Sequence, residues 1–136
     1  MFLLLVTAVG ALASACGAAN PFRLDDQVAL FTDDVRWGRM PAAETQLSPA
    51  LRATFARRHA AWGRALNVMD VEVDATRVSG LVGTVRTRYV WMRRNDMETR
   101  ETIVESHWRA TPLNSSWVCE DESIVSGDPG LLVAIR

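Results

Sequence analysis

The chain has 136 residues, which is the length of one domain, because compact domains usually hold about 100–200 residues. Fifteen basic and sixteen acidic residues give a formal net charge of -1, and this balance excludes the concentrated basic surface of most nucleic-acid-binding proteins. Apolar residues make up 49% of the chain and five residues are tryptophan, a composition that excludes intrinsic disorder. Two cysteines and two histidines leave little material for a metal centre, and nothing in the sequence points to a cofactor.

The N-terminal segment has the pattern of an export signal. The chain carries no charged side chain before Arg23, and residues 2–12 are mostly strongly apolar. This stretch is shorter than the roughly 20 residues of a bilayer-spanning helix, but it fits the apolar region of a secretory signal. It runs into Ala13-Ser14-Ala15-Cys16, a row of small residues before a cysteine.

This pattern resembles a bacterial lipoprotein precursor, in which a signal peptidase cuts before a cysteine that already carries diacylglycerol. The resemblance implies a signal peptide at 1–15, a lipidated Cys16 bearing acyl chains such as palmitate, and a linker over 16–24. Residues 25–136 would then form a single domain. Ala13 stands where the family usually has leucine, and no lysine or arginine follows Met1. Ordinary cleavage after Ala15 and an uncleaved anchor are the alternatives.

The resemblance also gives an expected location. Gly17 follows the cysteine in place of the aspartate that keeps some lipoproteins in the inner membrane. We therefore expect a lipid-anchored protein of the bacterial cell envelope, with the periplasmic face of the outer membrane favoured over the inner membrane. With Cys16 acylated, Cys119 has no partner in the chain, and we expect it in the core.

Two helices are predicted first in the mature chain. Val28, Phe31 and Val35 recur at helical spacing, which predicts a helix over about 25–39 with acidic residues near its start and Pro41 at its end. Ser48 as N-cap and Pro49 at the first helical position begin a second helix. Leu51, Phe55 and Trp62 mark its apolar face, and His59 is expected to face solvent.

From Leu66 onward the apolar period changes from about 3.5 to two, which predicts four strands of an antiparallel meander. In the first strand Met69, Val71, Val73 and Ala75 are expected to point inward, and the second and third strands are expected over about 82–94 and 98–111. In the fourth strand the expectation places Trp117 and Cys119 inward, and Glu120 and Glu122 outward.

Turn positions fix an expected register for the last three strands. A tight turn at Asn95 and Asp96 places Arg86 opposite Glu105. A turn at Leu113 and Asn114 places Trp108 opposite Cys119, Ala110 opposite Trp117, and His107 opposite Glu120. A slip of one residue would put most of the apolar set on the wrong face of the sheet.

Few residues suggest chemistry. His107 with Glu105 and Glu120 is the one constellation that resembles an acid–base or metal site, yet it lies on an expected outer face of alternating charge, where a solvated surface explains it. No catalytic or metal-ligating residue is therefore assigned. Possible pocket-lining residues are the inward aromatics, which equally suit a core: Trp62, Tyr89, Trp91, Trp108 and Trp117.

The order of elements, with a strand ending in Trp108-Arg109 and a strand starting at Trp117-Val118 after a turn, resembles the NTF2-like α+β cone, and a cystatin-like sheet wrapped on helices is a close alternative. The expected fold is therefore α+β, with two N-terminal helices packed on a four-stranded antiparallel meander. The NTF2-like family includes both enzymes and interaction domains, so fold alone does not assign a function.

Two functions are consistent with this sequence. One is a membrane-anchored, non-catalytic envelope lipoprotein that acts through protein contacts, with an envelope protein as partner, or as an accessory of a larger assembly. The other is an NTF2-like small-molecule-binding module or enzyme with a pocket between helices and sheet. Nucleic acid is not an expected partner, because the charge is balanced and an export signal is present.

Overall fold

The structure, a computed structural model, describes residues 21–112 and 116–132, with side chains from Leu24 onward in the first helix. Cys16 and the rest of the expected signal peptide and linker up to residue 20 lie outside the described residues. The elements, in chain order, are α1 (Pro21–Arg36), α2 (Met40–Glu44), α3 (Pro49–Arg58), β1 (Leu66–Ser79), β2 (Val82–Arg93), β3 (Thr99–Ala110), β4 (Trp117–Gly127) and the 3-10 helix η1 (Pro129–Leu132).

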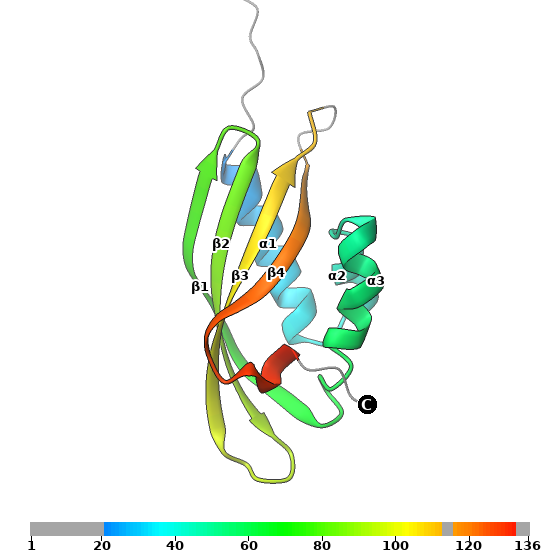
Figure 1. Cartoon of the computed structure of the whole chain (residues 1–136), viewed down its shortest axis with the longest axis vertical. Helices are drawn as coiled ribbons and strands as arrows, with labels where there is room; N and C mark the ends of the chain where they lie inside the picture. Colours follow the sequence, from blue (N-terminus) through cyan, green and yellow to red (C-terminus); the bar gives the residue numbers. More distant parts are fainter. Residues whose placement is uncertain (1–20, 113–115, 133–136) are drawn as a thin grey trace, which may run out of the picture.

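The four strands form one antiparallel sheet in the order β1-β2-β3-β4, and the helices lie on one side of it (Figure 1). Helix α1 runs along this side of the sheet, while α2 and α3 lie beside β4 (Figure 1). We call the face toward the helices the inner face and the opposite one the outer face. The expected α+β class with a four-stranded meander is confirmed, and the short helix α2 adds to the two helices expected.

Helix α1 starts earlier than the sequence pattern predicted. It begins at Pro21, so residues 21–24, expected as the end of the linker, are helical. Proline is favoured at the first helical position because its missing N–H has no partner there in any helix. The helix ends at Arg36, and Gly38 follows with a φ of 70°, a left-handed conformation that glycine adopts without strain. Pro41 lies in the first turn of α2.

Helix α3 begins as predicted. The Ser48 side chain accepts a hydrogen bond from the Leu51 amide at 3.2 Å, and Pro49 follows it. The residues just before the helix cover the start of β4 at the edge of the sheet. The Ser48 amide donates to the Cys119 carbonyl at 2.8 Å, and the Cys119 amide donates to the Gln46 carbonyl at 2.9 Å. Helix α3 is thereby fixed against β4.

The predicted register holds where apolar and polar residues alternate without interruption. Arg86 pairs with Glu105 along β2 and β3. At the start of β4, Trp108 pairs with Cys119 and Ala110 with Trp117. The last two pairs place the indole rings of Trp108 on β3 and Trp117 on β4 on the inner face.

Strand β1 departs from the expected alternation. Its register shifts between Val68 and Asp70 and again between Val73 and Ala75, because each β-bulge inserts one extra residue and reverses the faces of the residues that follow. Ala75 therefore pairs with Arg86, an outer-face residue, and Met69 is 49% exposed. The expectation that Met69 and Ala75 point inward is wrong. Bulges in an edge strand also discourage pairing with a further strand.

A third bulge changes the chemistry of the inner face. The register of β3 and β4 shifts between His107 and Trp108, so His107 pairs with Asp121 and not with Glu120. Beyond this shift Glu122 pairs with Ser106 on the inner face and is only 4% exposed. The expectation that Glu122 points outward is wrong, because it assumed unbroken alternation along β4.

Candidate functional site

Two titratable groups are buried together where α3 meets the inner face of the sheet: His59 at the end of α3 and Glu122 on β4. Their side chains are 3% and 4% exposed, and His59 Nε2 lies 3.5 Å from Glu122 Oε1. The expectation that His59 faces solvent is wrong. His59 follows Phe55 by four residues, on the same helical face, so it lies inside although Arg57 and Arg58 precede it in sequence.

Two aromatic rings and a backbone carbonyl contact the imidazole of His59. Its ring stacks on Phe55 with centroids 3.9 Å apart, and the Trp62 ring lies 4.7 Å away. His59 Nδ1 is 2.9 Å from the Phe55 carbonyl oxygen. Because a carbonyl oxygen only accepts hydrogen bonds, Nδ1 carries a hydrogen. In the neutral ring the lone pair of Nε2 therefore faces the carboxyl group of Glu122.

Arg58 is the charged neighbour of this pair. Its Nη1 donates to the Glu122 backbone carbonyl at 2.8 Å and lies 3.9 Å from Glu122 Oε1. Among the described residues, Oε1 has no hydrogen-bond partner. A buried carboxylate in this position is stabilised by Arg58 alone, at a distance longer than a hydrogen bond.

Burial moves the two pKa values in opposite directions. It raises the pKa of Glu122 to about 7, against the opposing effect of Arg58. It lowers the pKa of His59 to about 4, and the positive charge of Arg58 adds to this lowering. Both shifts favour uncharged groups, since burial penalises whichever form carries charge. Near neutral pH the pair therefore holds a neutral imidazole beside a carboxyl group close to its midpoint.

Such a pair has the electronic character of a general acid–base site. General acid–base catalysis also needs a substrate within hydrogen-bond reach, and Phe55 and Trp62 occupy the space around the imidazole. Burial raises the pKa of the nearby Cys119 thiol, and the negative charge of Glu122 raises it further. A thiol held in its protonated form is a poor nucleophile.

The aromatic residues named from the sequence all lie in the core. Trp91, Trp108 and Trp117 are at most 1% exposed, while Tyr89 and Trp62 are 4% and 8% exposed. Three of the indole N–H groups donate to protein acceptors at ordinary distances: Trp91 to Thr102 Oγ1 at 2.9 Å, Trp108 to Ser106 Oγ at 2.8 Å, and Trp62 to the Leu131 carbonyl at 2.7 Å.

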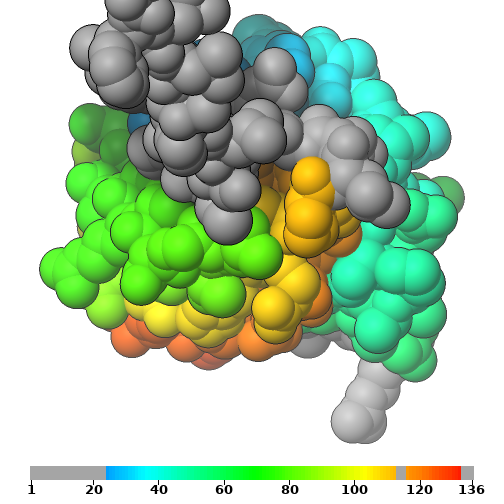
Figure 2. All heavy atoms as spheres, turned by 90° about the horizontal axis from the view of Figure 1, so that it is seen from above, coloured from blue at the N-terminus to red at the C-terminus, as the bar shows by residue number. Residues whose placement is uncertain are grey.

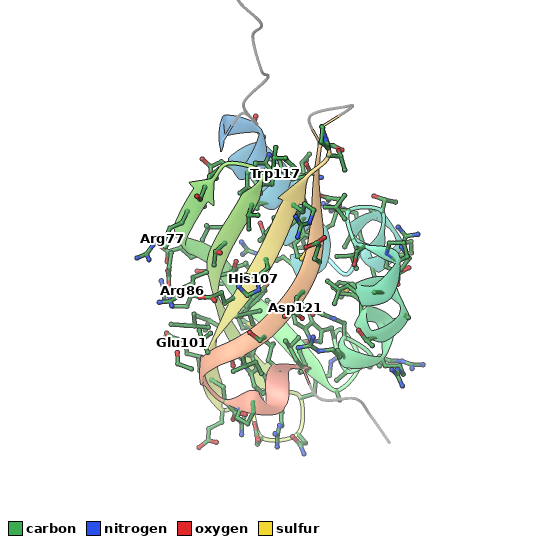
Figure 3. All side chains as sticks on the ribbon, turned by 45° about the horizontal axis from the view of Figure 1, so that its top comes forward. Arg77, Arg86, Glu101, His107, Trp117 and Asp121 are labelled. Carbon is green, nitrogen blue, oxygen red and sulfur yellow. The ribbon has the colours of Figure 1, made fainter. Side chains whose placement is uncertain are left out.

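The acid–base constellation expected on the outer face forms only in part. His107 Nε2 lies 3.4 Å from Glu105, whose other carboxylate oxygen accepts from Arg86 Nε at 2.8 Å. Figure 3 shows His107 close to Asp121 on the neighbouring strand, and His107 Nδ1 is 3.9 Å from Asp121 Oδ2. Glu120, the partner expected from the sequence, accepts instead from Arg109 at 2.8 Å.

Hollows in the surface lie between α1 and the edge strand β1. One of about 370 Å³ is lined by residues 35–38, 62–63 and 67–69. A neighbouring one of about 210 Å³ is lined by Ala29, Thr32, Asp33, Arg36, Val71 and Val73. Arg36 lines both, so we name the two together the α1–β1 groove. Trp37 and Met69 at the groove are 65% and 49% exposed.

Two further findings concern the described part of the chain. No helix in it is long and apolar enough to cross a bilayer. No group of three or more histidine, cysteine or acidic side chains in it is placed to hold a metal ion.

Comparisons with known proteins show a similarity of fold alone. No protein-family model matches the sequence, and no curated protein matches it. A crystal structure from Nostoc punctiforme, described as a protein of unknown function with a cystatin-like fold, is similar to this chain with a TM-score of 0.56 and 13% sequence identity. The similarity covers 81% of this chain and 92% of the other. It supports the cystatin-like form among the two architectures expected.

Proposed function

We propose that this chain is a membrane-anchored, non-catalytic lipoprotein of the bacterial cell envelope that acts through protein contacts or as an accessory of a larger assembly. The proposed anchor is an acylated Cys16, after small residues that suit a lipoprotein signal peptidase. Gly17 after the cysteine favours the periplasmic face of the outer membrane over the inner membrane.

The observation that carries the non-catalytic part is the filling of the inner face. A cone-shaped sheet can bind a ligand only if its interior leaves room for one. Here Trp91, Trp108 and Trp117 are at most 1% exposed, and the first two donate their indole hydrogens to β3 side chains. The polar groups of these two indoles are satisfied inside the chain, as in a core built for packing.

The α1–β1 groove is the surface through which we expect contact with a partner. A second copy of the chain, paired edge to edge along β1, would bring together two rows of acidic side chains, Asp70, Glu72 and Asp74, which in each copy pair with only two arginines, Arg36 and Arg88. Like charges in facing positions on paired strands are unfavourable. The groove therefore suits another envelope protein, one with apolar side chains for Trp37 and Met69.

Mass spectrometry and membrane fractionation test the anchor. We expect the native protein to begin at Cys16, to carry acyl mass and to remain in the membrane fraction. The Cys16→Ser variant should appear in the soluble fraction. Membrane fractionation unchanged by this substitution would refute the acyl anchor.

Site-specific photo-crosslinking in the native cell tests the contact surface. A photoreactive side chain at Met69 should give one adduct of defined mass, which Trp37→Asp should abolish. The matched control is Val125 on β4, whose side chain has a similar exposure of 45% and lies at the opposite edge of the sheet. Equal adducts from both positions would argue against the groove.

The second candidate function is a small-molecule-binding module or an enzyme that uses the inner face, and the inward pair His59 and Glu122 is the observation that favours it. The two functions differ in what Glu122→Gln does. In a binding module or enzyme this substitution should abolish binding or turnover. In an interaction protein it should leave the Met69 adduct unchanged.

A further inference from the structure

The start of α1 is fixed at one end of the sheet. An ideal Cβ on Gly83 of β2 would lie 2.4 Å from Leu24 Cδ2, so the helix and strand approach closely there. The Trp117 amide at the start of β4 donates to Gln27 Oε1 at 2.8 Å. The turn that joins β1 to β2 lies at the same end (Figure 1). We call it the α1-start end.

The proposed anchor must lie near this end. Four residues separate Cys16 from Pro21, and five fully extended residue steps span about 17 Å at most. Strand β2 has 12 residues, and a strand of this length extends about 40 Å. The opposite end of the sheet, where β2 turns into β3, therefore lies beyond the reach of the linker.

The α1-start end presents apolar side chains to solvent. Leu81 in the β1–β2 turn is 42% exposed, and Val82 beside it is 44% exposed. Figure 2, which views the molecule from this end, shows the bright green turn at its surface. The Leu81 carbonyl accepts a hydrogen bond from the Ala110 amide at 2.8 Å, so β3 holds the turn in place while its side chains point to solvent.

The charges around the sheet favour contact with lipid by this end over contact by the outer face. The outer face carries acidic side chains on three strands, β1, β3 and β4, among them Glu72, Glu101, Glu105 and Asp121. Arg86 and Arg88 of β2 pair with three of these carboxylates, and an anionic lipid surface repels the acidic side chains. Asp25 and Asp26 on α1 are exposed near the α1-start end, which limits lipid contact to the tip of the turn.

We propose that the β1–β2 turn, with Leu81 and Val82, rests on the surface of the membrane that holds the Cys16 acyl chains, so that the sheet stands away from the bilayer. This orientation rests on the proposed anchor. One apolar turn gives only weak lipid affinity, and the acyl chains supply the rest. Helix α1 has 16 residues and extends about 24 Å, so Trp37 and its end of the α1–β1 groove lie well above the lipid, open to a partner.

Depth-dependent fluorescence quenching tests this orientation. The full acylated chain would be labelled with an environment-sensitive fluorophore at Leu81→Cys and placed in vesicles of phosphatidylethanolamine and phosphatidylglycerol that contain headgroup-labelled quencher lipid. Met97→Cys in the β2–β3 turn is the matched control, because Met97 is 73% exposed. Cys119 is buried and should not take up the label.

We expect the label at position 81 to shift to shorter wavelength and to lose most of its intensity, and the label at position 97 to stay as it is in water. Equal quenching at both positions, or stronger quenching at 97, would overturn the orientation and leave the anchor intact. Absence of acyl mass from the same sample would overturn the anchor, and the orientation with it.

Discussion

At each face of the sheet a histidine lies near a carboxyl group: His59 of α3 near Glu122 at the inner face, and His107 of β3 near Glu105 at the outer face. The pKa values of the two carboxyl groups shift in opposite directions. On the inner face burial raises the pKa of Glu122 and lowers that of His59. On the outer face the side-chain hydrogen bond from Arg86 lowers the pKa of Glu105. The comparison teaches that burial, and not residue type alone, decides the protonation state of these side chains.

The largest loss of stability is expected when a core tryptophan is replaced, and a surface tryptophan provides the comparison. Trp108 is 1% exposed and its ring packs edge to face on Phe31 with centroids 5.5 Å apart. Trp108→Ala should lower the free energy of unfolding by about 3–5 kcal/mol, because it leaves a cavity. Chemical denaturation measures this.

Trp37→Ala is the control for the same residue type on the surface. Trp37 is 65% exposed, so its loss should change the free energy of unfolding by less than about 0.5 kcal/mol. Similar costs for the two substitutions would mean that the inner face is not the tightly packed core described above.

The buried pair gives the next effect, visible in the pH dependence of stability. In His59→Gln the pKa of Glu122 stays above its ordinary value of 4.5, because burial is the first cause of its rise to about 7. A group whose folded pKa is raised stabilises the fold at low pH, and this contribution is lost as pH rises through the folded value. The free energy of unfolding of His59→Gln should therefore fall between about pH 4.5 and 7.

The reciprocal substitution Glu122→Gln should give the opposite slope. Burial holds the pKa of His59 near 4, below its ordinary value of 6.5. The unfolded chain then binds a proton at a higher pH than the folded chain, so stability should fall as pH drops from about 6.5 toward 4. In the unsubstituted chain the two slopes oppose each other. Equal slopes in the two variants would show that the pair does not lie as described.

The smallest effect concerns the outer face. Arg86 donates to Glu105 at 2.8 Å, and its side chain is 56% exposed. Exposed ion pairs of this kind contribute about 0.2–1 kcal/mol, so Arg86→Gln should cost no more than that, with a smaller cost at high salt. A loss comparable with that of Trp108→Ala would give the outer face a structural role that solvation does not explain.

The two faces of the sheet also differ in how well the sequence predicts them. The pairing of Arg86 with Glu105 was predictable because β2 and β3 alternate without a bulge between them. Glu122 escaped prediction because a bulge reversed the faces in the middle of β4. One signal was available: Trp117 and Cys119 are odd-numbered inward residues and Ile124, which packs against the core, is even-numbered, so the strand must change face between them.

The buried position of His59 could also have been predicted from residue spacing. Leu51, Phe55 and His59 lie four residues apart, on one helical face, and the two arginines before His59 concealed this spacing. The bulges of β1 left no comparable pattern. Edge strands have one partner and a partly solvated inner side, so their apolar alternation is weak where the bulges occur.

Counting reactive thiols tests the central claim, that the inner face is a closed core and the chain acts through its surface and its anchor. Cys119 lies on the inner face near Glu122 and is 0% exposed. The proposed acylation occupies the thiol of the other cysteine, Cys16. With a chromogenic thiol reagent we predict no reactive thiol in the native protein and one after denaturation. Rapid reaction of one thiol in the native state, with no second thiol after denaturation, would contradict a closed inner face. Two thiols after denaturation would contradict the anchor.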